Sequence, residues 1–308
     1  MSERQKSPRA GWLPKWLAPR GLSRTARIGV VADSAACVPP PWSAARDFKQ
    51  LGLSIIVDNQ VHGEDPNALM MGLAMGKSVK TSRTSPGEFS AAYQQLAEAG
   101  CEQIISIHLS SALSGTVDAA RLAASSAPVP VHVVDSMSVA LPLGFAVADV
   151  LAARDAGAPM AMLEQIAATA AANTVYFAVP SLEQLRRGGR ISTLSSVFGS
   201  LLNVKPILGI VDGAIAPLEK PRSFARAQAR LVALALADVK QAEGPVRLGV
   251  MHFGAGELAA EIATELAPHS AEPVVTSSLP AVLAAHTGLG VLAVCAAPLH
   301  PQPPEPAR

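Results

Sequence analysis

The chain has 308 residues, a formal net charge of +1 and only 4% aromatic residues, while 49% of its residues are hydrophobic. The near-neutral charge argues against a nucleic-acid-binding surface, and no apolar run reaches the roughly 20 residues that a membrane-spanning helix needs. The three cysteines, Cys37, Cys101 and Cys295, lack the spacing of metal ligands. Their odd number favours a reducing, cytoplasmic setting over a disulfide framework.

Both ends of the chain differ in composition from the part between them. Residues 1–26 form a basic extension that contains Trp12 and Trp16, and we expect it to be disordered. The alternative is a transient contact with an anionic membrane surface. Residues 300–308 form a proline-rich tail that should not pack against a domain.

Strands and helices alternate through residues 27–172, which we interpret as an N-terminal α/β domain. The expected strands are Ile28–Ala32, Ile104–Leu109 and Val131–Val134, and the expected helices are Glu88–Ala99, Gly115–Ala124 and Ala158–Ala172. Ser85 and Pro86 are typical of a helix start, and Gly100 of a helix end. This alternation predicts right-handed crossovers and a largely parallel sheet.

A second set of elements fills residues 173–299, which we interpret as a smaller C-terminal α/β domain. The Asp212-Gly213 pair between two apolar runs predicts a β-hairpin with a two-residue turn. The other expected elements are the strands Val175–Val179, Leu248–His252 and Val291–Cys295, the helices Leu182–Arg187, Phe224–Lys240 and Gly256–Leu266, and an amphipathic run to Leu202. We therefore expect two α/β domains with a ligand between them.

The stretch from Ile104 to Thr116 combines the pattern of a buried strand with a cluster of hydroxyl groups. The four hydroxyl side chains of this cluster, which lie within seven residues after the strand, belong to Ser110, Ser111, Ser114 and Thr116. In open α/β sheets ligands bind beyond the carboxyl ends of the strands. Hydroxyl groups there can bind a carboxylate, a phosphate or a sugar without adding a charge. The stretch therefore predicts a binding site and leaves the class of ligand open.

Several motifs of catalytic and cofactor sites are missing from the sequence. No G-x-G-x-x-G opens a helix, no Walker lysine is present and no G-x-S-x-G elbow occurs. The histidines are scattered without the spacing of metal ligands, so we expect neither a metal nor a cofactor. A dyad of Ser114 and His286 leaves a serine-dependent lipid or ester hydrolase open as an alternative, although no orienting acid is evident.

Seven motifs, in the same order, resemble those of the DegV family, whose members include the fatty-acid-binding subunit (FakB-type) of bacterial fatty acid kinase. They are V-A-D-S-A-A at Val31, K-T-S-R-T-S-P at Lys80, I-H-L-S-S-A-L-S-G-T at Ile107, V-D-S-M-S at Val134, L-E-Q-L-R-R-G-G-R-I-S at Leu182, L-L-N-V-K-P-I-L at Leu201 and A-A-H-T-G-L-G at Ala284. The resemblance covers roughly residues 27–297.

The resemblance implies a two-domain DegV-like fold that buries a long-chain fatty acid at the domain junction, in a chain that is not itself an enzyme. It implies that the carboxylate is held by Thr81, Ser82, Ser114 and His286. Further contacts are expected from Asp33, Ser34, Ser110, Ser111 and Gly115. Arg190 and Arg222 match arginines that are associated with docking the catalytic subunit of the kinase. That subunit would phosphorylate the bound carboxylate with ATP.

Two positions depart from the family pattern. Arg83 stands where members often have glutamine, and Leu289 where they often have proline. An arginine bound to both carboxylate oxygens would compete with phosphorylation, so we expect Arg83 to point away from the head or to act only at a distance. The chain-length preference stays open, and another apolar carboxylic acid remains an alternative ligand. Met70, Met71 and Met75 are expected to fill the core.

Overall fold

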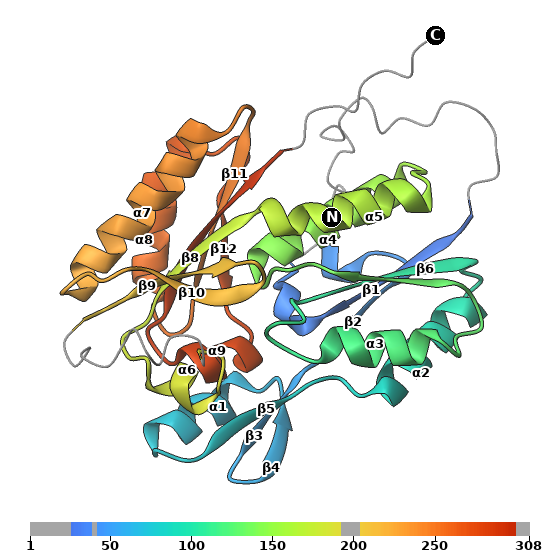
Figure 1. The fold of residues 1–308 in the computed structure, drawn as a ribbon, viewed down its shortest axis with the longest axis horizontal. Coiled ribbons are helices and arrows are strands. Elements are labelled where there is room, and N and C mark those ends of the chain that lie inside the picture. Colours follow the sequence, from blue (N-terminus) through green and yellow to red (C-terminus); the bar gives the residue numbers. More distant parts are fainter. Residues whose placement is uncertain (1–25, 39–41, 192–203, 300–308) are drawn as a thin grey trace, which may run out of the picture.

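The structure, a computed structural model, describes residues 26–38, 42–191 and 204–299 (Figure 1). Within these ranges the strands form three sheets: one parallel, one mixed and one small and antiparallel. Outside them lie residues 1–25 of the expected N-terminal extension, the amphipathic run to Leu202 and the tail at 300–308.

Four parallel strands form the sheet of the N-terminal half, in the order β2-β1-β6-β7. They are β1 (Ile28–Asp33), β2 (Phe48–Leu51), β6 (Gln103–His108) and β7 (Val131–Asp135). One face is covered by α2 (Pro86–Glu98) and α3 (Thr116–Ala124), and the other by α4 (Leu141–Asp155) and α5 (Met160–Ala168) (Figure 1). The expected parallel sheet is confirmed, and helices cover both of its faces, as is usual for parallel sheets.

Six strands form the sheet of the C-terminal half, in the order β10-β9-β8-β13-β11-β12. They are β8 (Thr174–Ala178), β9 (Ile207–Val211), β10 (Ala214–Glu219), β11 (Val246–His252), β12 (Val275–Ser278) and β13 (Leu292–Pro298). The β11–β12 pair is parallel and the other neighbours are antiparallel. Helices α7 (Phe224–Gln241) and α8 (Gly256–Leu266) pack on its outer face (Figure 1). The expected α/β fold class is thus confirmed, with a mixed sheet in the second half.

A third sheet of short strands was not predicted from the sequence. It consists of β3 (Ser54–Val57), β4 (Gln60–Gly63) and β5 (Val79–Ser82), with helix α1 (Pro66–Ala74) between β4 and β5. Helix α9 (Ala281–Thr287), which follows β12, contacts both β3 and β5, and it also packs against α6 (Glu183–Arg187). The small sheet therefore joins the two halves of the chain, below both larger sheets in Figure 1.

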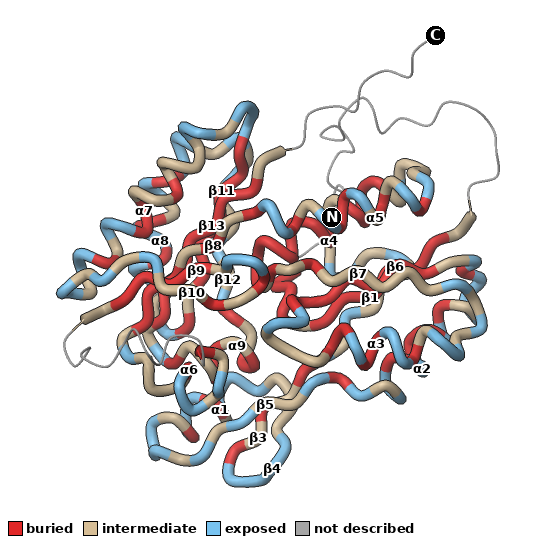
Figure 2. Tube along the Cα trace, viewed as in Figure 1, coloured by how far each residue is buried: buried red, intermediate tan, exposed pale blue. Residues whose placement is uncertain are grey.

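Three methionines in and directly after α1 lie at the surface and not in the core. Met70, Met71 and Met75 are 39%, 65% and 63% exposed, so the expectation that they fill the core was wrong. Helix α1 buries Leu69 and Gly72 instead, and a side chain at Gly72 would collide with Val57. In Figure 2 the red, buried segments gather along the strands of the larger sheets, whereas β4 and α1 carry exposed segments.

Helix α4 lies between the two larger sheets, where it contacts β1 and β13. All but three of its 15 residues are buried. Asp149 of this helix pairs with Arg247 of β11, with Nη1 and Oδ1 2.8 Å apart. The same guanidinium lies 4.4 Å from the ring centroid of Phe145. Helix α4 was missed because a helix that is buried on nearly all sides has no clear amphipathic period to detect.

Local signals in the sequence located several elements well. Asp212 and Gly213 have φ angles of 49° and 77°, so both turn residues of the predicted β9–β10 hairpin are left-handed, as a type I′ turn requires. Helix α2 begins with a capping box, in which Ser85 accepts from the backbone of Glu88 and the Glu88 carboxylate accepts from the backbone of Ser85.

Candidate functional site

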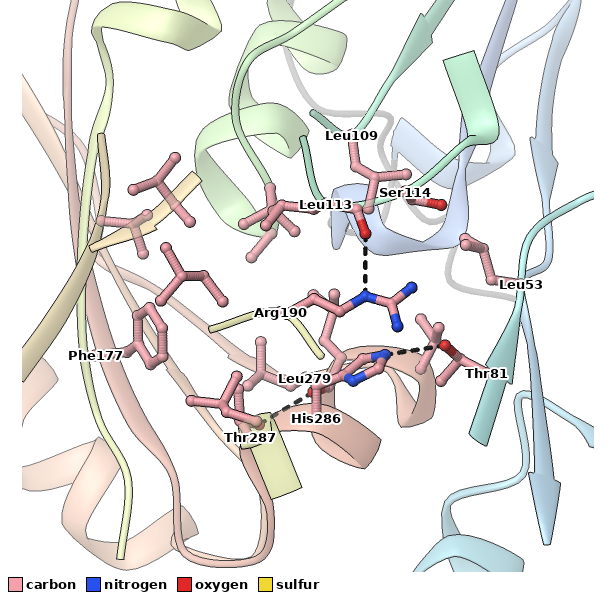
Figure 3. Close-up of a pocket in the computed structure, with 18 of the residues that line it drawn as sticks. Leu53, Thr81, Leu109, Leu113, Ser114, Phe177, Arg190, Leu279, His286 and Thr287 are labelled. Atoms are coloured by element: carbon pink, nitrogen blue, oxygen red, sulfur yellow. Dashed lines mark hydrogen bonds between the residues drawn. The ribbon is translucent and has the colours of Figure 1, made fainter. Parts of the chain in front are cut away.

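A cavity of about 380 Å³ lies between the two larger sheets and extends to strand β5 of the small sheet. Its volume falls in the range of roughly 300–1,000 Å³ that is usual for ligand sites. Apolar side chains from several elements wall most of it, among them Val175 and Phe177 of β8, Ile210 of β9, Ile215 of β10 and Met251 of β11. In Figure 3 Phe177 lies on the side of β8, whereas Thr81, Ser114 and His286, which are expected to hold a carboxylate, lie toward the opposite side.

Four polar residues predicted from the sequence come together in the lining of this cavity, and we call them the head cluster: Thr81, Ser82, Ser114 and His286. They come from three places that are distant in the sequence. Thr81 and Ser82 end β5, Ser114 lies in the turn between β6 and α3, and His286 lies in the last turn of α9. Gly115 lines the cavity beside Ser114. The fold therefore brings together hydroxyl groups and an imidazole at one end of an otherwise apolar space.

His286 is the titratable residue of the head cluster. Its Nε2 lies 2.9 Å from Oγ1 of Thr81, and its buried Nδ1 has no hydrogen-bond partner among the described residues (Figure 3). Burial, together with the nearby charge of Arg190, lowers the pKa of His286 from 6.5 to about 4. The imidazole is therefore neutral at neutral pH. Gly188 lies against the ring, and any side chain at that position would overlap with Nδ1.

Ser114 is held by the turn that follows β6. Its backbone N–H donates to the carbonyl of Ser110 at 3.2 Å, and its hydroxyl lies 2.8 Å from that of Thr116. Thr116 is buried and opens α3. When Thr116 is the donor of this pair, the O–H of Ser114 remains free to donate toward the cavity.

Arg190 and Arg83 also line the cavity. Arg190 donates from Nε to the carbonyl of Leu113 at 3.2 Å (Figure 3) and from Nη1 to that of Gly188 at 2.6 Å. Arg83 lies over the same turn, and a side chain at Gly115 would collide with its Nη1. The side chain of Arg83 therefore lines the polar end of the cavity and does not point away from it, and the alternative, that Arg83 acts on the head only at a distance, stays a prediction. Its position next to Thr81 and Ser82 in the sequence was the signal for this placement.

Asp33 was expected near the ligand but lies outside the cavity lining. It belongs to a fully buried set of side chains that we call the strand-end network: Asp33, Tyr93, Ser106 and His108. Asp33 accepts from the backbone of Ala35 and of Leu109, both at 3.0 Å, and lies 3.1 Å from Nδ1 of His108. His108 Nε2 lies 2.7 Å from the Ser106 hydroxyl, which is 2.9 Å from that of Tyr93. The network therefore ties the end of β1 to β6 and α2.

Ser34 lies outside the cavity lining and forms hydrogen bonds that connect neighbouring elements. Its hydroxyl donates to Glu64 and accepts from the backbone of Leu53 at 3.0 Å. The second oxygen of Glu64 accepts from the backbone of Val282, at the start of α9, at 3.5 Å. Burial raises the pKa of the Glu64 carboxyl above its usual value. Ser34 and Glu64 together therefore connect the end of β1 to the helix that carries His286.

The other three predicted residues lie outside the lining. Ser110 is buried and its hydroxyl accepts from the backbone of Ala112 at 3.2 Å. Ser111 is exposed, and its backbone donates to Asp135. Arg222 is exposed, just before α7. The proposed docking role of Arg190 and Arg222 stays a prediction.

The described residues hold no group of three or more His, Cys, Asp or Glu side chains that could bind a metal ion. None of their helices is both long and apolar enough to span a bilayer. What the site offers is hydroxyl donors, a neutral imidazole and two guanidinium groups at one end of an apolar cavity. Such an arrangement suits a ligand with a long apolar body and a single anionic head.

Comparison with known proteins agrees with this arrangement. The chain is 38% identical over 275 residues to a DegV domain-containing protein of Streptomyces coelicolor, which covers 87% of this chain and 97% of that protein. Two solved structures superpose over 89% of this chain and all of theirs. One is a Thermus thermophilus DegV family protein whose structure is described for its fatty acid binding (TM-score 0.80, 27% identity). The other is DegV, a fatty acid binding protein from Bacillus subtilis (TM-score 0.79, 30% identity).

The model of a protein family described as uncharacterised and named DegV matches residues 27–299. This match spans both larger sheets, the small sheet and every member of the head cluster. The chain therefore belongs to the DegV family.

Proposed function

We propose that this protein binds a long-chain fatty acid in the cavity and presents its carboxylate to a separate, ATP-dependent kinase subunit in the cytoplasm. The observation that carries the proposal is the division of the cavity into a long apolar part and a polar end formed by the head cluster. The fatty acid binding of the related DegV structures from Thermus thermophilus and Bacillus subtilis supports the same ligand class.

The apolar walls supply most of the binding free energy in this proposal. A chain of about 15 methylenes gains on the order of 12 kcal/mol on full burial, at roughly 0.8 kcal/mol each. The loss of translational freedom and the ordering of the chain reduce this gain substantially. What remains is sufficient for tight binding, provided that the charged head is not left without hydrogen-bond donors.

The head cluster supplies these donors. In the tautomer that we assign to His286, Nε2–H donates to Oγ1 of Thr81, so that the threonine hydroxyl is free to donate to the carboxylate. Ser82 and Ser114 add two further hydroxyl donors. Each hydrogen bond to a charged acceptor contributes about 1.5–3 kcal/mol. Because His286 stays neutral, it orients Thr81 without forming an ion pair with the ligand.

The proposed transfer of a phosphoryl group takes place on a partner. Phosphoryl transfer from ATP needs Mg²⁺ and a cradle for the phosphates, and neither a Walker lysine nor a glycine-rich phosphate loop occurs in this sequence. In the proposal, this chain contributes the bound acyl group and an accessible carboxylate oxygen, and the kinase subunit contributes the nucleotide site.

A serine-dependent hydrolase built on Ser114 and His286 fits the geometry less well. The hydroxyl of Ser114 pairs with Thr116, and Nε2 of His286 pairs with Thr81. Nδ1 of His286 has no partner among the described residues, so no carboxylate orients the ring as a general base requires. These contacts favour binding over hydrolysis.

Mass spectrometry of the ligand extracted from protein purified without additives tests the proposal. We expect a free long-chain fatty acid, released by denaturation in an amount close to one per chain. A covalent adduct of Ser114 with a fluorophosphonate probe would support the hydrolase instead. Protein free of lipid that also fails to bind added fatty acid would contradict the proposal.

A further inference from the structure

The polar end of the cavity carries more positive charge than a carboxylate neutralises. Among the lining residues the ionisable ones are Arg83, Arg190 and His286, and no Asp or Glu is among them. Neither arginine forms an ion pair with a carboxylate of any described residue. A fatty acid with one negative charge would therefore leave one of the two guanidinium charges without a counter-charge.

The two arginines lie against the same short turn. Arg190 donates to the carbonyl of Leu113, one residue before Ser114. Arg83 lies against Gly115, one residue after Ser114, in space that any side chain at that position would fill. The turn that presents the Ser114 hydroxyl thus has a guanidinium group at each end. Arg190 is half-buried and Arg83 is exposed, so the pair extends from inside the cavity to its mouth.

Guanidinium groups match the geometry of phosphate oxygens. Their N–H groups form a planar fork that binds phosphate through paired, charge-assisted hydrogen bonds. A phosphate monoester carries nearly two negative charges at neutral pH and offers three acceptor oxygens. Together with the hydroxyl donors of the head cluster, two guanidinium groups would satisfy these oxygens and neutralise both charges.

We propose that Arg83 and Arg190 make this site selective for a dianionic phosphate head on a single acyl chain over a monoanionic head. This inference rests on the proposed function, because it assumes that the acyl chain occupies the apolar part of the cavity. Arg83 is the determinant that distinguishes the charge of the head, since it adds the second cation at the mouth. The two sources of such a ligand are a phosphate attached directly to the acyl chain and a lipid phosphate joined to it through glycerol.

Displacement of a fluorescent fatty acid by four non-reactive amphiphiles tests the inference. Palmitate and hexadecyl sulfate carry one charge, on a planar and on a tetrahedral head. Hexadecyl phosphate and palmitoyl lysophosphatidate carry nearly two at about pH 8, since the second pKa of a phosphate ester is roughly 6. We expect the full-length protein to bind hexadecyl phosphate about tenfold more tightly than hexadecyl sulfate. Tighter binding of hexadecyl phosphate than of lysophosphatidate would assign the site to a phosphate attached directly to the chain, and the reverse to a lipid phosphate.

Variants of the two arginines separate charge from general packing. Arg83→Gln should reduce the preference for hexadecyl phosphate over hexadecyl sulfate about fivefold to tenfold, and it should weaken palmitate by a smaller factor than it weakens hexadecyl phosphate. Arg190→Gln should reduce the same preference. The matched control is Lys80→Gln, which removes an exposed cation of β5 that does not line the cavity, and it should leave all four affinities unchanged.

Two results would overturn the inference. If the protein binds palmitate but binds hexadecyl phosphate and hexadecyl sulfate equally, the arginines do not select the charge of the head, although the proposed function stands. The same conclusion follows if Arg83→Gln weakens all four amphiphiles by the same factor. If none of the four amphiphiles, palmitate included, displaces the probe, the proposed function itself fails, and the inference fails with it.

Discussion

The strand-end network and the head cluster are two groups of polar side chains with similar chemistry and opposite environments. Each contains a histidine hydrogen-bonded to a hydroxyl group. In the strand-end network every member is fully buried or nearly so, and His108 has a partner on both ring nitrogens. In the head cluster one nitrogen of His286 has no partner in the described part of the chain, and the hydroxyl-bearing residues line a cavity.

This difference distinguishes polar side chains that stabilise the fold from polar side chains that can bind a ligand. Asp33 is hydrogen-bonded to His108, and His108 to Ser106, as in a catalytic triad. None of the three residues lines the cavity. A buried network whose members satisfy one another stabilises a fold. Donors that the chain leaves unsatisfied beside an apolar cavity are available to a ligand. Access, and not the identity of the residues, therefore decides which cluster binds.

The largest expected effect comes from breaking the strand-end network. Asp33→Ala removes the acceptor of three buried hydrogen bonds and should lower the free energy of unfolding by about 3–5 kcal/mol. Urea denaturation measures this change. Ser111→Ala, at an exposed position beyond the same sheet, should change it by less than about 0.5 kcal/mol. A loss of less than about 1 kcal/mol for Asp33→Ala would show that the network does not stabilise the fold.

The head cluster should respond in the opposite way. Thr81→Val keeps the shape of the side chain but removes the hydroxyl that pairs with His286, so we expect about a tenfold to hundredfold loss of fatty acid affinity. The free energy of unfolding should change by no more than about 1 kcal/mol. Displacement of a fluorescent fatty acid measures the affinity, and Thr276→Val at an exposed site of β12 is the control. Unchanged affinity for Thr81→Val would remove the hydroxyl from the site.

The titration of His286 in the head cluster predicts how the stability of the protein depends on pH. Its pKa is lowered from 6.5 to about 4 in the folded chain, so between these values the unfolded state binds a proton that the folded state does not. Stability due to this group is therefore present above about pH 6.5 and is lost as the pH falls toward 4. We expect His286→Gln to lose less stability than the wild type over this window. Parallel losses in both proteins would indicate that His286 is not buried as a neutral group.

The smallest expected effect concerns the link between the two clusters. Glu64 joins Ser34, next to Asp33, to the start of α9. Glu64→Ala should lower fatty acid affinity about threefold to tenfold by releasing the helix that positions His286. Glu64→Gln should restore most of it, because the amide oxygen can accept from the backbone of Val282 while the amide NH2 donates to the Ser34 hydroxyl. Equal affinities for the alanine and glutamine variants would argue against a positioning role.

The sequence predicted most of the parallel sheet and the members of the head cluster for different reasons. The strands and the hairpin at Asp212-Gly213 follow from local patterns. The grouping of Thr81, Ser114 and His286 came from the resemblance to the DegV family, because no local pattern places residues 205 positions apart within 2.9 Å.

What the sequence did not predict depends on burial and on tertiary contacts. Helix α4 has no polar face, so periodicity could not detect it. The four-residue strands of the small sheet are too short for an alternating pattern to be distinctive. Asp33 and Arg83 were placed by their neighbours in sequence alone. In the structure Asp33 lies in the buried strand-end network and Arg83 lines the cavity, and tertiary packing determines both placements.

The position of a bound fatty acid tests most directly whether the cavity holds the acyl chain in its apolar part and the carboxylate at the head cluster. Crystals of the protein with a palmitate brominated at its terminal carbon would locate the bromine by anomalous scattering. We expect the bromine beside Phe177 and the carboxylate within hydrogen-bond distance of Oγ1 of Thr81. A bromine beside His286, or a fatty acid bound outside the cavity, would contradict the assignment of the head cluster.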